Sequence, residues 1–422
     1  MMRRIHWNLF LLIAGFFIAT HTLLFYLNAC TQQTNNSFLC MKTSRYIVPD
    51  SQNHVTISEL ITKTMQSNKW TTEKKLNNVS CEESYRKMNV TSLSESVRSE
   101  IGYFETSLRK IEYKNNLIPD RPENFFQIKK EIVQNLVEDY IIIPNINCPY
   151  LVAIQPSLFD RQYERDDIRQ TWASVAKEQI WPNRKVNADV KVVFVVARQI
   201  ETDHISTVSS LENSTHIITE SGSDIYLESA MHGDILYLDM EESYRNLTLK
   251  VLSAFKWVRD SCPCVKFVLK VDYDTFVNIP LLVDTLIYFE NRLENSILGM
   301  IYTAISFVSR EGRWGVNSSL YPMRSFPEYA SGCGYVLSFQ AMSKIVEKVP
   351  YFLMLPVEDV FITGVMRRVA ELDMFSLGMM FTHYLDKSWN KCSMIQSQKI
   401  LGTGDAGKRH IETWDAFVKN KC

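Results

Sequence analysis

The stretch that most constrains this chain is Val265–Asn278, where a strand pattern leads directly into two acids. Val265–Leu269 is rich in β-branched and aromatic residues, which predicts a strand that is buried on at least one face. Asp272 and Asp274 follow it, at the place where open α/β sheets bind their ligands. Carboxylates suit a hard divalent cation that bridges a protein to a diphosphate. An isolated Asp-x-Asp is nevertheless more often a solvated turn, so the rest of the chain has to decide between the two.

The rest of the chain shows an alternation of strand and helix patterns that begins near Cys148. Further apolar runs of strand type occur at Tyr150–Ile154 and Val190–Ala197. Helical patterns lie between and after the strands, at Asp166–Glu178, Asn246–Arg259 and Ile279–Asn291. Strands that alternate with helices predict an α/β fold with a mostly parallel sheet. We expect one domain of this class over residues 148–422.

The amino terminus predicts a membrane anchor. Residues 7–27 contain no Asp, Glu, Lys or Arg, and about 20 such residues can span a bilayer. The alternative is a cleaved signal peptide, but its apolar core is usually only about 7–15 residues long. Two arginines precede the run and the next basic residue is Lys42, so the positive-inside rule keeps residues 1–6 cytosolic. We therefore expect a single-pass signal anchor, a lumenal stem at 28–147 and a lumenal domain.

Composition narrows the class of partner. The formal charge is -1 over 422 residues, and no basic stripe or block points to nucleic acid. Nine cysteines fit an oxidising compartment, and their spacing is poor for zinc. Six N-x-S/T sequons agree with a glycosylated protein of the secretory pathway, at Asn35, Asn78, Asn89, Asn213, Asn246 and Asn317.

The expected stem is polar and carries one helical pattern. In Ser92–Ile111, apolar residues recur at spacings of three and four, which predicts an amphipathic helix. Two uses of its apolar face stay open: packing on the main domain, or self-association that makes a homodimer through the stem or the anchor.

Three basic residues are candidates for binding an anion. Arg165 and Arg169 are four residues apart, so on a helix they share one face. Paired guanidinium groups can hold a diphosphate, but a structural ion-pair network is the more common outcome. Lys250 lies on a further predicted helix, where it can reach a phosphate, pair with an acid or remain at the surface.

Two later motifs are candidates for contacting a sugar. Gly332 and Gly334 permit close backbone approach by a ligand, and Tyr329 and Tyr335 offer rings for stacking. A tight connection between elements is the ordinary explanation of such glycines. Glu358 and Asp359 precede a helical pattern, where acids usually act as caps, but either can instead serve as a general base.

In this order and at these separations, the segments resemble the β-1,3-glycosyltransferases of the galactosyltransferase type, glycosyltransferase family 31. The resemblance runs from about Tyr150 to the carboxyl terminus. The motifs that carry it are RDDIRQTW at Arg165–Trp172, GDI at Gly233–Ile235, SYRNLTLK at Ser243–Lys250, KVDYDTFVN at Lys270–Asn278, FPEYASGCGYVLS at Phe326–Ser338 and EDV at Glu358–Val360. Such enzymes are type II proteins of the Golgi membrane, with a short tail, an anchor, a stem and a lumenal catalytic domain.

The resemblance implies a GT-A fold, in which a Rossmann-like sheet binds a UDP-sugar together with a divalent cation, usually Mn²⁺. Asp274 would then ligate the metal, and Asp272 would contact the ribose or a metal-bound water. Arg165, Arg169 and Lys250 would help to shape the donor pocket.

The resemblance also implies an inverting transfer that forms a β-1,3 linkage to a glycan acceptor on a glycoprotein or glycolipid. Asp359 would be the base, with Glu358 as the alternative. Tyr329, Gly332 and Gly334 would line the sugar and acceptor cleft. Galactose is the favoured sugar, and N-acetylglucosamine and N-acetylgalactosamine are the alternatives.

Three features depart from the family's pattern. Tyr273 stands where many relatives have a third acid, and Cys333 stands in the glycine loop where a small residue is more common. Many relatives also have a late histidine that completes the metal shell. The corresponding stretch, Gln398–Gly407, has none, and His383 and His410 on either side are the candidates to replace it. These departures keep a rival function open, a lumenal glycan-binding protein with the same fold and little catalysis.

Overall fold

The computed structural model describes residues 90–422, except for 115, 117, 119–121, 123, 183, 200–224, 384–390, 397–398, 405–406 and 422. The described residues belong to one compact unit of the chain. The expected tail, the anchor at 7–27 and the first part of the stem lie outside them, as do the sequons at Asn35, Asn78, Asn89 and Asn213. Among the residues that are described, no helix has the length and apolar character needed to span a membrane.

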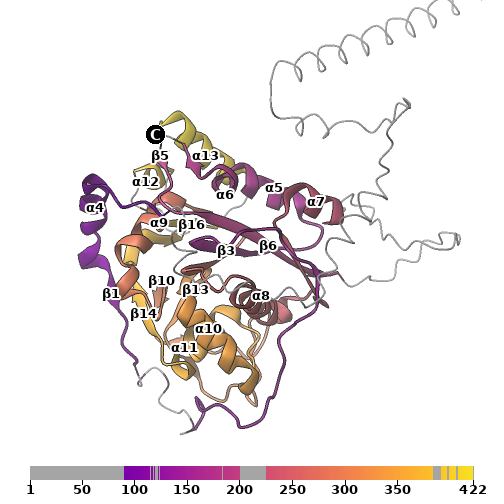
Figure 1. The fold of residues 1–422 in the computed structure, drawn as a ribbon. Helices are drawn as coiled ribbons and strands as arrows, with labels where there is room; N and C mark the ends of the chain where they lie inside the picture. The colour runs from indigo at the N-terminus through magenta and orange to yellow at the C-terminus, as the bar shows by residue number, and fades with distance from the viewer. Residues whose placement is uncertain are drawn as a thin grey trace, which may run out of the picture. The chain divides into compact units, whose positions relative to one another are not determined.

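Within the described residues, a nine-stranded sheet forms the centre of the fold (Figure 1). Its order is β1 (Arg109–Lys110), β14 (Asp373–Ser376), β10 (Ser296–Tyr302), β13 (Tyr329–Ser338), β8 (Phe267–Val271), β3 (Leu151–Pro156), β6 (Val190–Arg198), β7 (Ile235–Glu241) and β2 (Tyr140–Ile142). The strands β14, β10, β8, β3, β6 and β7 run in one direction, whereas β1, β13 and β2 oppose their neighbours. The predicted mostly parallel α/β sheet is therefore confirmed.

Three smaller sheets occur in the described part of the chain. Their strands are β15 (Phe381–His383), β16 (Leu401–Thr403) and β9 (Thr275–Val277) in one, β11 (Ser306–Phe307) and β12 (Ser325–Phe326) in another, and β4 (Ile180–Trp181) and β5 (Arg184–Lys185) in the third. The first of these matters for the site, because β9 directly follows the Asp-x-Asp segment.

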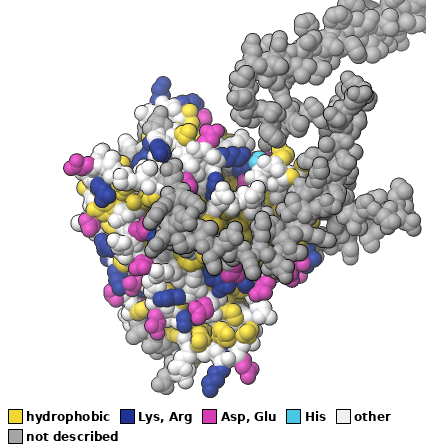
Figure 2. All heavy atoms as spheres, viewed as in Figure 1, with side chains coloured by type: hydrophobic (Ala, Val, Ile, Leu, Met, Phe, Trp, Pro, Cys, Tyr) yellow, Lys and Arg dark blue, Asp and Glu magenta, His cyan; other side chains and the backbone are white. Residues whose placement is uncertain are grey.

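Helices cover both faces of the central sheet (Figure 1). One face is covered by α8 (Leu247–Ser261), α10 (Phe339–Lys348) and α11 (Met366–Val369), and the other by α5 (Gln162–Gln170), α9 (Ile279–Tyr288) and α13 (Lys408–Lys419). The remaining helices are α4 (Glu95–Gly102), α6 (Val175–Glu178), α7 (Ile225–His232) and α12 (Lys391–Ile395), with a π-helix at Val360–Val365 and 3₁₀ turns at Glu105–Ser107, Trp172–Ser174, Tyr244–Asn246, Glu290–Arg292, Val349–Tyr351 and Gly378–Met380. On the face that Figure 2 shows, basic and acidic side chains are interspersed.

The strand β6 shows why both faces need a cover. Val192 and Phe194 belong to one buried cluster, whereas Val193 and Val195 belong to the other. Successive strand residues point to opposite faces, so a nearly continuous apolar run is what a strand between two helical layers requires. This run is the reason that the sequence alone predicted the strand.

Part of the segment expected to be a stem belongs to this fold. β1 and β2 lie at opposite edges of the central sheet, and Ile101 of α4 is buried in a core cluster that it shares with α9. Of the two uses considered for the apolar stripe in Ser92–Ile111, the described residues show packing on the main domain. The central sheet therefore includes two strands from before residue 148, and strands of two and three residues are too short to show a periodic pattern.

Candidate active site

The Asp-x-Asp segment begins where β8 ends, at the carboxyl end of the strand. The backbone N–H of Asp272 donates to the carbonyl of Cys333 (3.1 Å), which ties the segment to β13. The carbonyl of Asp274 accepts from the N–H of Gly404 (3.1 Å), and the Thr403 hydroxyl lies 3.5 Å from its Oδ1. β13 thus holds Asp272 and the β16 segment holds Asp274, while the side chain of Asp272 remains 37% exposed.

Lys270 lies buried beneath Asp272. Its ammonium donates to Oδ1 of Asp272 (2.6 Å) and to the carbonyl of Gly332 (2.6 Å), and it lies 3.2 Å from Oε2 of Glu358. Burial on its own lowers the pKa of Lys270, but the charges of Asp272 and Glu358 outweigh burial and raise it. The sequence interpretation missed this residue. The available signal was its position two residues before Asp272, on the same face of the strand.

Glu358 is engaged on both carboxylate oxygens. The Tyr335 hydroxyl donates to Oε1, and the ammonium of Lys270 lies beside Oε2. The side chain is 3% exposed, and burial raises its pKa to about 7. A carboxylate enclosed in this way is poorly placed to meet an acceptor hydroxyl.

Asp359 is half-buried and differs from Glu358 in its partners. Oδ2 accepts from the backbone N–H of Gly332 (2.9 Å), and Oδ1 accepts from the N–H of Val360 (2.8 Å), at the start of the π-helix. Burial raises the pKa of Asp359 as well. Asp359 is less buried than Glu358, and each of its oxygens keeps lone-pair capacity beyond its single bond, so of the two acids it fits the predicted base better.

The two glycines of the predicted sugar cleft make close packing possible. A Cβ on Gly332 would lie 3.1 Å from Oδ2 of Asp359, and a Cβ on Gly334 would lie 2.6 Å from Cδ1 of Leu401. Gly332 therefore lets β13 approach the acid, which fits the predicted cleft. Gly334 serves the contact between β13 and β16, which is a packing role.

Tyr329 lies on the same side of the site as Asp359. Burial and, next, the charge of Asp359 raise the pKa of Tyr329 to about 12. Its ring centroid is 5.1 Å from that of Tyr302, which is 40% exposed. Two tyrosine rings beside an acid can contact the apolar face of a sugar.

The three cations expected to shape the donor pocket are buried in ion pairs. All five N–H groups of Arg165 bond within the chain, to Glu228 (2.8 and 2.6 Å), Ser157 Oγ (3.0 Å) and the carbonyls of Leu158 (2.5 Å) and Phe159 (3.2 Å). Lys250 donates to the carbonyl of Ser157 (2.6 Å) and to Glu242 (2.5 Å). Both side chains thus hold the loop that follows β3, the parallel neighbour of β8.

Arg169 completes the network. Its guanidinium donates to both oxygens of Asp234 (2.9 and 2.7 Å), lies 2.7 Å from Glu228 and stacks 4.6 Å above the ring of Phe194. The ion-pair network was the alternative to direct diphosphate binding, and the structure favours it. Arg165 is fully buried, which is the arrangement expected of a structural ion pair.

The acids fit a divalent cation that also binds a diphosphate. Such a cation needs only about one or two protein carboxylates, which Asp272 and Asp274 can supply. Among the described residues, no three Asp, Glu, His or Cys side chains are grouped as a complete metal site. The backbone of His383 pairs opposite Thr403, beside Asp274, and its side chain lies outside the described part of the structure. His410 is fully buried, with its ring 5.8 Å from that of Phe276, so it belongs to the core.

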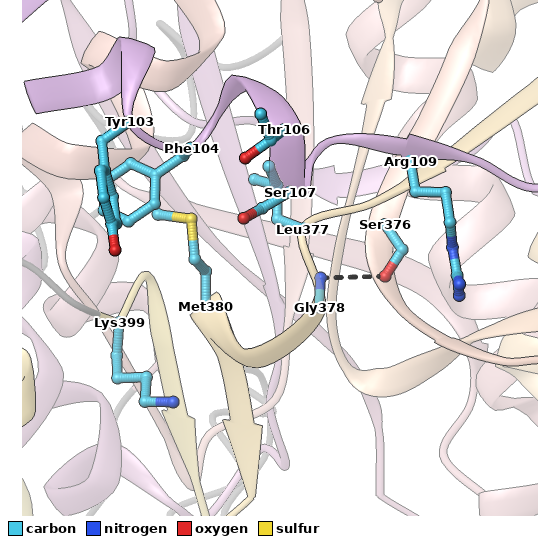
Figure 3. Close-up of a pocket in the computed structure, with 10 residues that line it drawn as sticks. All are labelled: Tyr103, Phe104, Thr106, Ser107, Arg109, Ser376, Leu377, Gly378, Met380 and Lys399. Atoms are coloured by element: carbon cyan, nitrogen blue, oxygen red, sulfur yellow. Dashed lines mark hydrogen bonds between the residues drawn. The ribbon is translucent and has the colours of Figure 1, made fainter. Parts of the chain in front are cut away.

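A cavity of about 590 Å³ lies elsewhere, beside the β1–β14 edge (Figure 3). Tyr103 and Phe104 line one side, and Arg109 lies on the other beside Ser376, whose Oγ accepts from the N–H of Gly378 (3.1 Å). None of the predicted site residues lines it. β14 is three places from β8 in the sheet, so we assign this cavity no part in the chemistry of the two acid pairs.

Comparison with known proteins shows the family of this chain. The family model described as Galactosyltransferase matches residues 163–377, which include every residue predicted to act in catalysis, metal binding, donor binding or the sugar cleft except His383 and His410. UDP-GalNAc:beta-1,3-N-acetylgalactosaminyltransferase 1 of Rattus norvegicus is 29% identical over 281 residues, which are 64% of this chain and 75% of that protein. Beta-1,3-galactosyltransferase 5 of Homo sapiens is 28% identical over 280 residues, 62% of this chain and 81% of that protein.

A solved structure, the WbbM bifunctional glycosyltransferase in its apo form, aligns with 66% of this chain and half of its own length, at 8% identity and a TM-score of 0.35. A TM-score this low does not establish a shared fold. The family assignment therefore depends on the sequence match through the motifs and on the acids that those motifs bring together. On these grounds the chain belongs to the galactosyltransferase family of glycosyltransferases.

Proposed function

We propose that this chain is a metal-dependent, inverting β-1,3-hexosyltransferase that transfers a hexose from a UDP-sugar to the 3-hydroxyl of a glycan on a glycoprotein or glycolipid. One observation carries the proposal. The carbonyl of Gly332 accepts a hydrogen bond from Lys270, which also donates to Asp272, and the N–H of Gly332 donates to Asp359. Gly332 thus links the acid on the nucleotide side of the proposed site to the proposed base. The galactosyl- and N-acetylgalactosaminyltransferases among the relatives support the reaction class.

The reaction divides between the two ends of this site. Asp272 and Asp274 would hold the cation, which when bound stabilises the charge on the departing UDP. At the other end, Asp359 accepts the proton of the acceptor hydroxyl as its oxygen forms a bond to the anomeric carbon. The bond from that carbon to the diphosphate oxygen breaks on the opposite side, which inverts the configuration. The N–H groups of Gly332 and Val360 keep the base oriented.

The donor sugar is the next choice to test. Galactose is the favoured donor sugar, and N-acetylgalactosamine is close behind because relatives of both kinds match. Turnover of UDP-galactose, UDP-N-acetylgalactosamine and UDP-N-acetylglucosamine should be compared with the purified residues 90–422 and a panel of glycan acceptors. Binding of a glycan without turnover of any of the three donors would instead favour the rival glycan-binding function.

Removal of the metal ligand should uncouple nucleotide binding from the metal. We expect Asp274→Ala to weaken UDP binding in the presence of Mn²⁺ by about 10-fold or more, which is about 1.4 kcal/mol. Titration calorimetry with Mn²⁺ and with a chelator measures this. Tyr273→Phe is the matched control, because Tyr273 is the exposed centre of the same motif and should leave UDP affinity unchanged. Wild-type binding that is the same with the chelator would exclude the metal role.

The same proposal places the protein in the Golgi membrane, with a single span and a lumenal domain. The apolar run at 7–27 and the six sequons support this topology.

The lumenal placement makes Asn317 a testable glycosylation site. Asn317 is exposed, and its Oδ1 accepts from the Ser319 hydroxyl (3.0 Å) of the same sequon. In a secretory expression host, Asn317→Gln should lose one glycan, seen as faster gel migration that glycosidase treatment abolishes. Asn246 is the comparison, because its amide already donates to the carbonyl of Glu241 (3.1 Å) and has to give up that bond to be modified. Identical migration of Asn317→Gln and wild type contradicts the assignment.

A further inference from the structure

Lys270 contacts three groups that belong to different parts of the proposed reaction. Asp272 is on the nucleotide side, Glu358 precedes the base, and Gly332 holds the base through its N–H. The ammonium is 1% exposed and is enclosed between β8, β13 and the segment before the π-helix. One buried cation therefore connects both ends of the site.

A purely structural role would explain why Lys270 is buried, but it would not explain which groups Lys270 contacts. The pair with Glu358 is buried on both sides, as an ion pair of the core would be. The pair with Asp272 is not, because the Asp272 side chain is 37% exposed at the site. The ammonium thus fixes an acid that is partly exposed at the proposed site. The ammonium attracts both this carboxylate and that of Glu358. A change at either carboxylate therefore alters how strongly the ammonium interacts with the other.

We propose that Lys270 is a positioning residue that couples the nucleotide end of the site to the base end. Its ammonium donates to Oδ1 of Asp272 and to the Gly332 carbonyl, and it balances the charge of Glu358. These contacts keep Asp272 and Asp359 at a fixed distance and orientation relative to each other. This inference rests on the proposed function, which supplies the roles of the two ends. A change at Glu358, which does not face the nucleotide, should therefore alter nucleotide binding through Lys270.

The test is the affinity for UDP in the presence of Mn²⁺, measured by calorimetry. Glu358→Gln removes one of the two charges that share the ammonium, so Lys270 acts more strongly on Asp272 and competes with the cation for it. We expect UDP affinity to fall by about 3- to 10-fold, within the range found for coupled neighbours. The matched control is Asp284→Asn, a buried acid paired with Arg184 on the side of α9, which should leave UDP affinity unchanged.

The second arm repeats Glu358→Gln in a Lys270→Met background. There the coupling group is absent, so Glu358→Gln should no longer change UDP affinity. The double variant should also melt at a higher temperature than Lys270→Met alone, because it removes the buried acid that Lys270→Met leaves without its cation. If Lys270→Met alone does not fold, the first arm still decides, because unchanged UDP affinity in Glu358→Gln overturns the coupling.

Three outcomes separate this inference from the proposed function. A fall in UDP affinity in Glu358→Gln that disappears in the Lys270→Met background supports the coupling. Unchanged affinity in Glu358→Gln, with the effect of Asp274→Ala intact, overturns the coupling and leaves the proposed function standing. Absence of UDP binding in the wild type overturns the proposed function itself.

Discussion

Asp359→Asn should reduce kcat by about 10²–10⁴-fold, the usual contribution of a general base, and leave the affinity for UDP with Mn²⁺ unchanged. Asparagine has nearly the same shape but cannot accept the proton of the acceptor hydroxyl. The nucleotide end of the site is held by Lys270, Asp272 and Asp274, so it should survive the substitution. Initial rates together with UDP calorimetry separate the two effects.

Two further observations make this result specific. Asparagine keeps one acceptor oxygen for one of the two N–H groups, that of Gly332 or that of Val360, and leaves the other without its acceptor, so the expected loss of stability is about 1–3 kcal/mol. Asp373→Asn, which removes a surface pair with Lys110, is the control and should leave kcat unchanged. Because burial raises the pKa of Asp359, the wild-type activity should fall on acidification at a pH above the ordinary value of about 3.9. Loss of UDP binding in step with kcat would refute the assignment of Asp359 as the base.

The sequence predicted those parts of the fold that have a regular apolar pattern. β3, β6 and β8 were found because strands between two helical layers are apolar on both faces. β1 and β2 were missed because strands of two or three residues show no period, although they complete the sheet at both edges. Their location before residue 148 also made polar composition a poor guide to the start of the domain.

The same distinction explains what could be predicted of the site. Asp272, Asp274, Glu358 and Asp359 follow from motifs, because each pair lies at the end of one element. The roles of the cations depend on partners that are distant in sequence. Arg165 meets Glu228, and Lys250 meets the carbonyl of Ser157, only through the folded sheet. No local pattern could therefore show that these side chains are buried and not available to a diphosphate.

Because Arg165 is buried in an ion pair, we expect Arg165→Met to lower the free energy of unfolding substantially. Removing one partner from a buried ion pair typically costs about 3–5 kcal/mol, because the remaining charge stays buried. Here Glu228, which is fully buried, keeps only its contact with Arg169. The loop after β3 also loses three of its hydrogen bonds, to Ser157, Leu158 and Phe159. Chemical denaturation of residues 90–422 measures the free energy of unfolding.

A matched variant separates this structural role from direct binding of the donor. Arg165→Met combined with Glu228→Met should recover most of the lost stability, because replacing a whole buried pair by apolar residues is often neutral. If Arg165 were instead a ligand of the diphosphate, the single variant would lose UDP affinity at nearly unchanged free energy of unfolding, and the second substitution would restore nothing. The buried geometry requires the opposite order, in which stability falls first and the nucleotide site is affected only through the loop that Arg165 and Lys250 hold together.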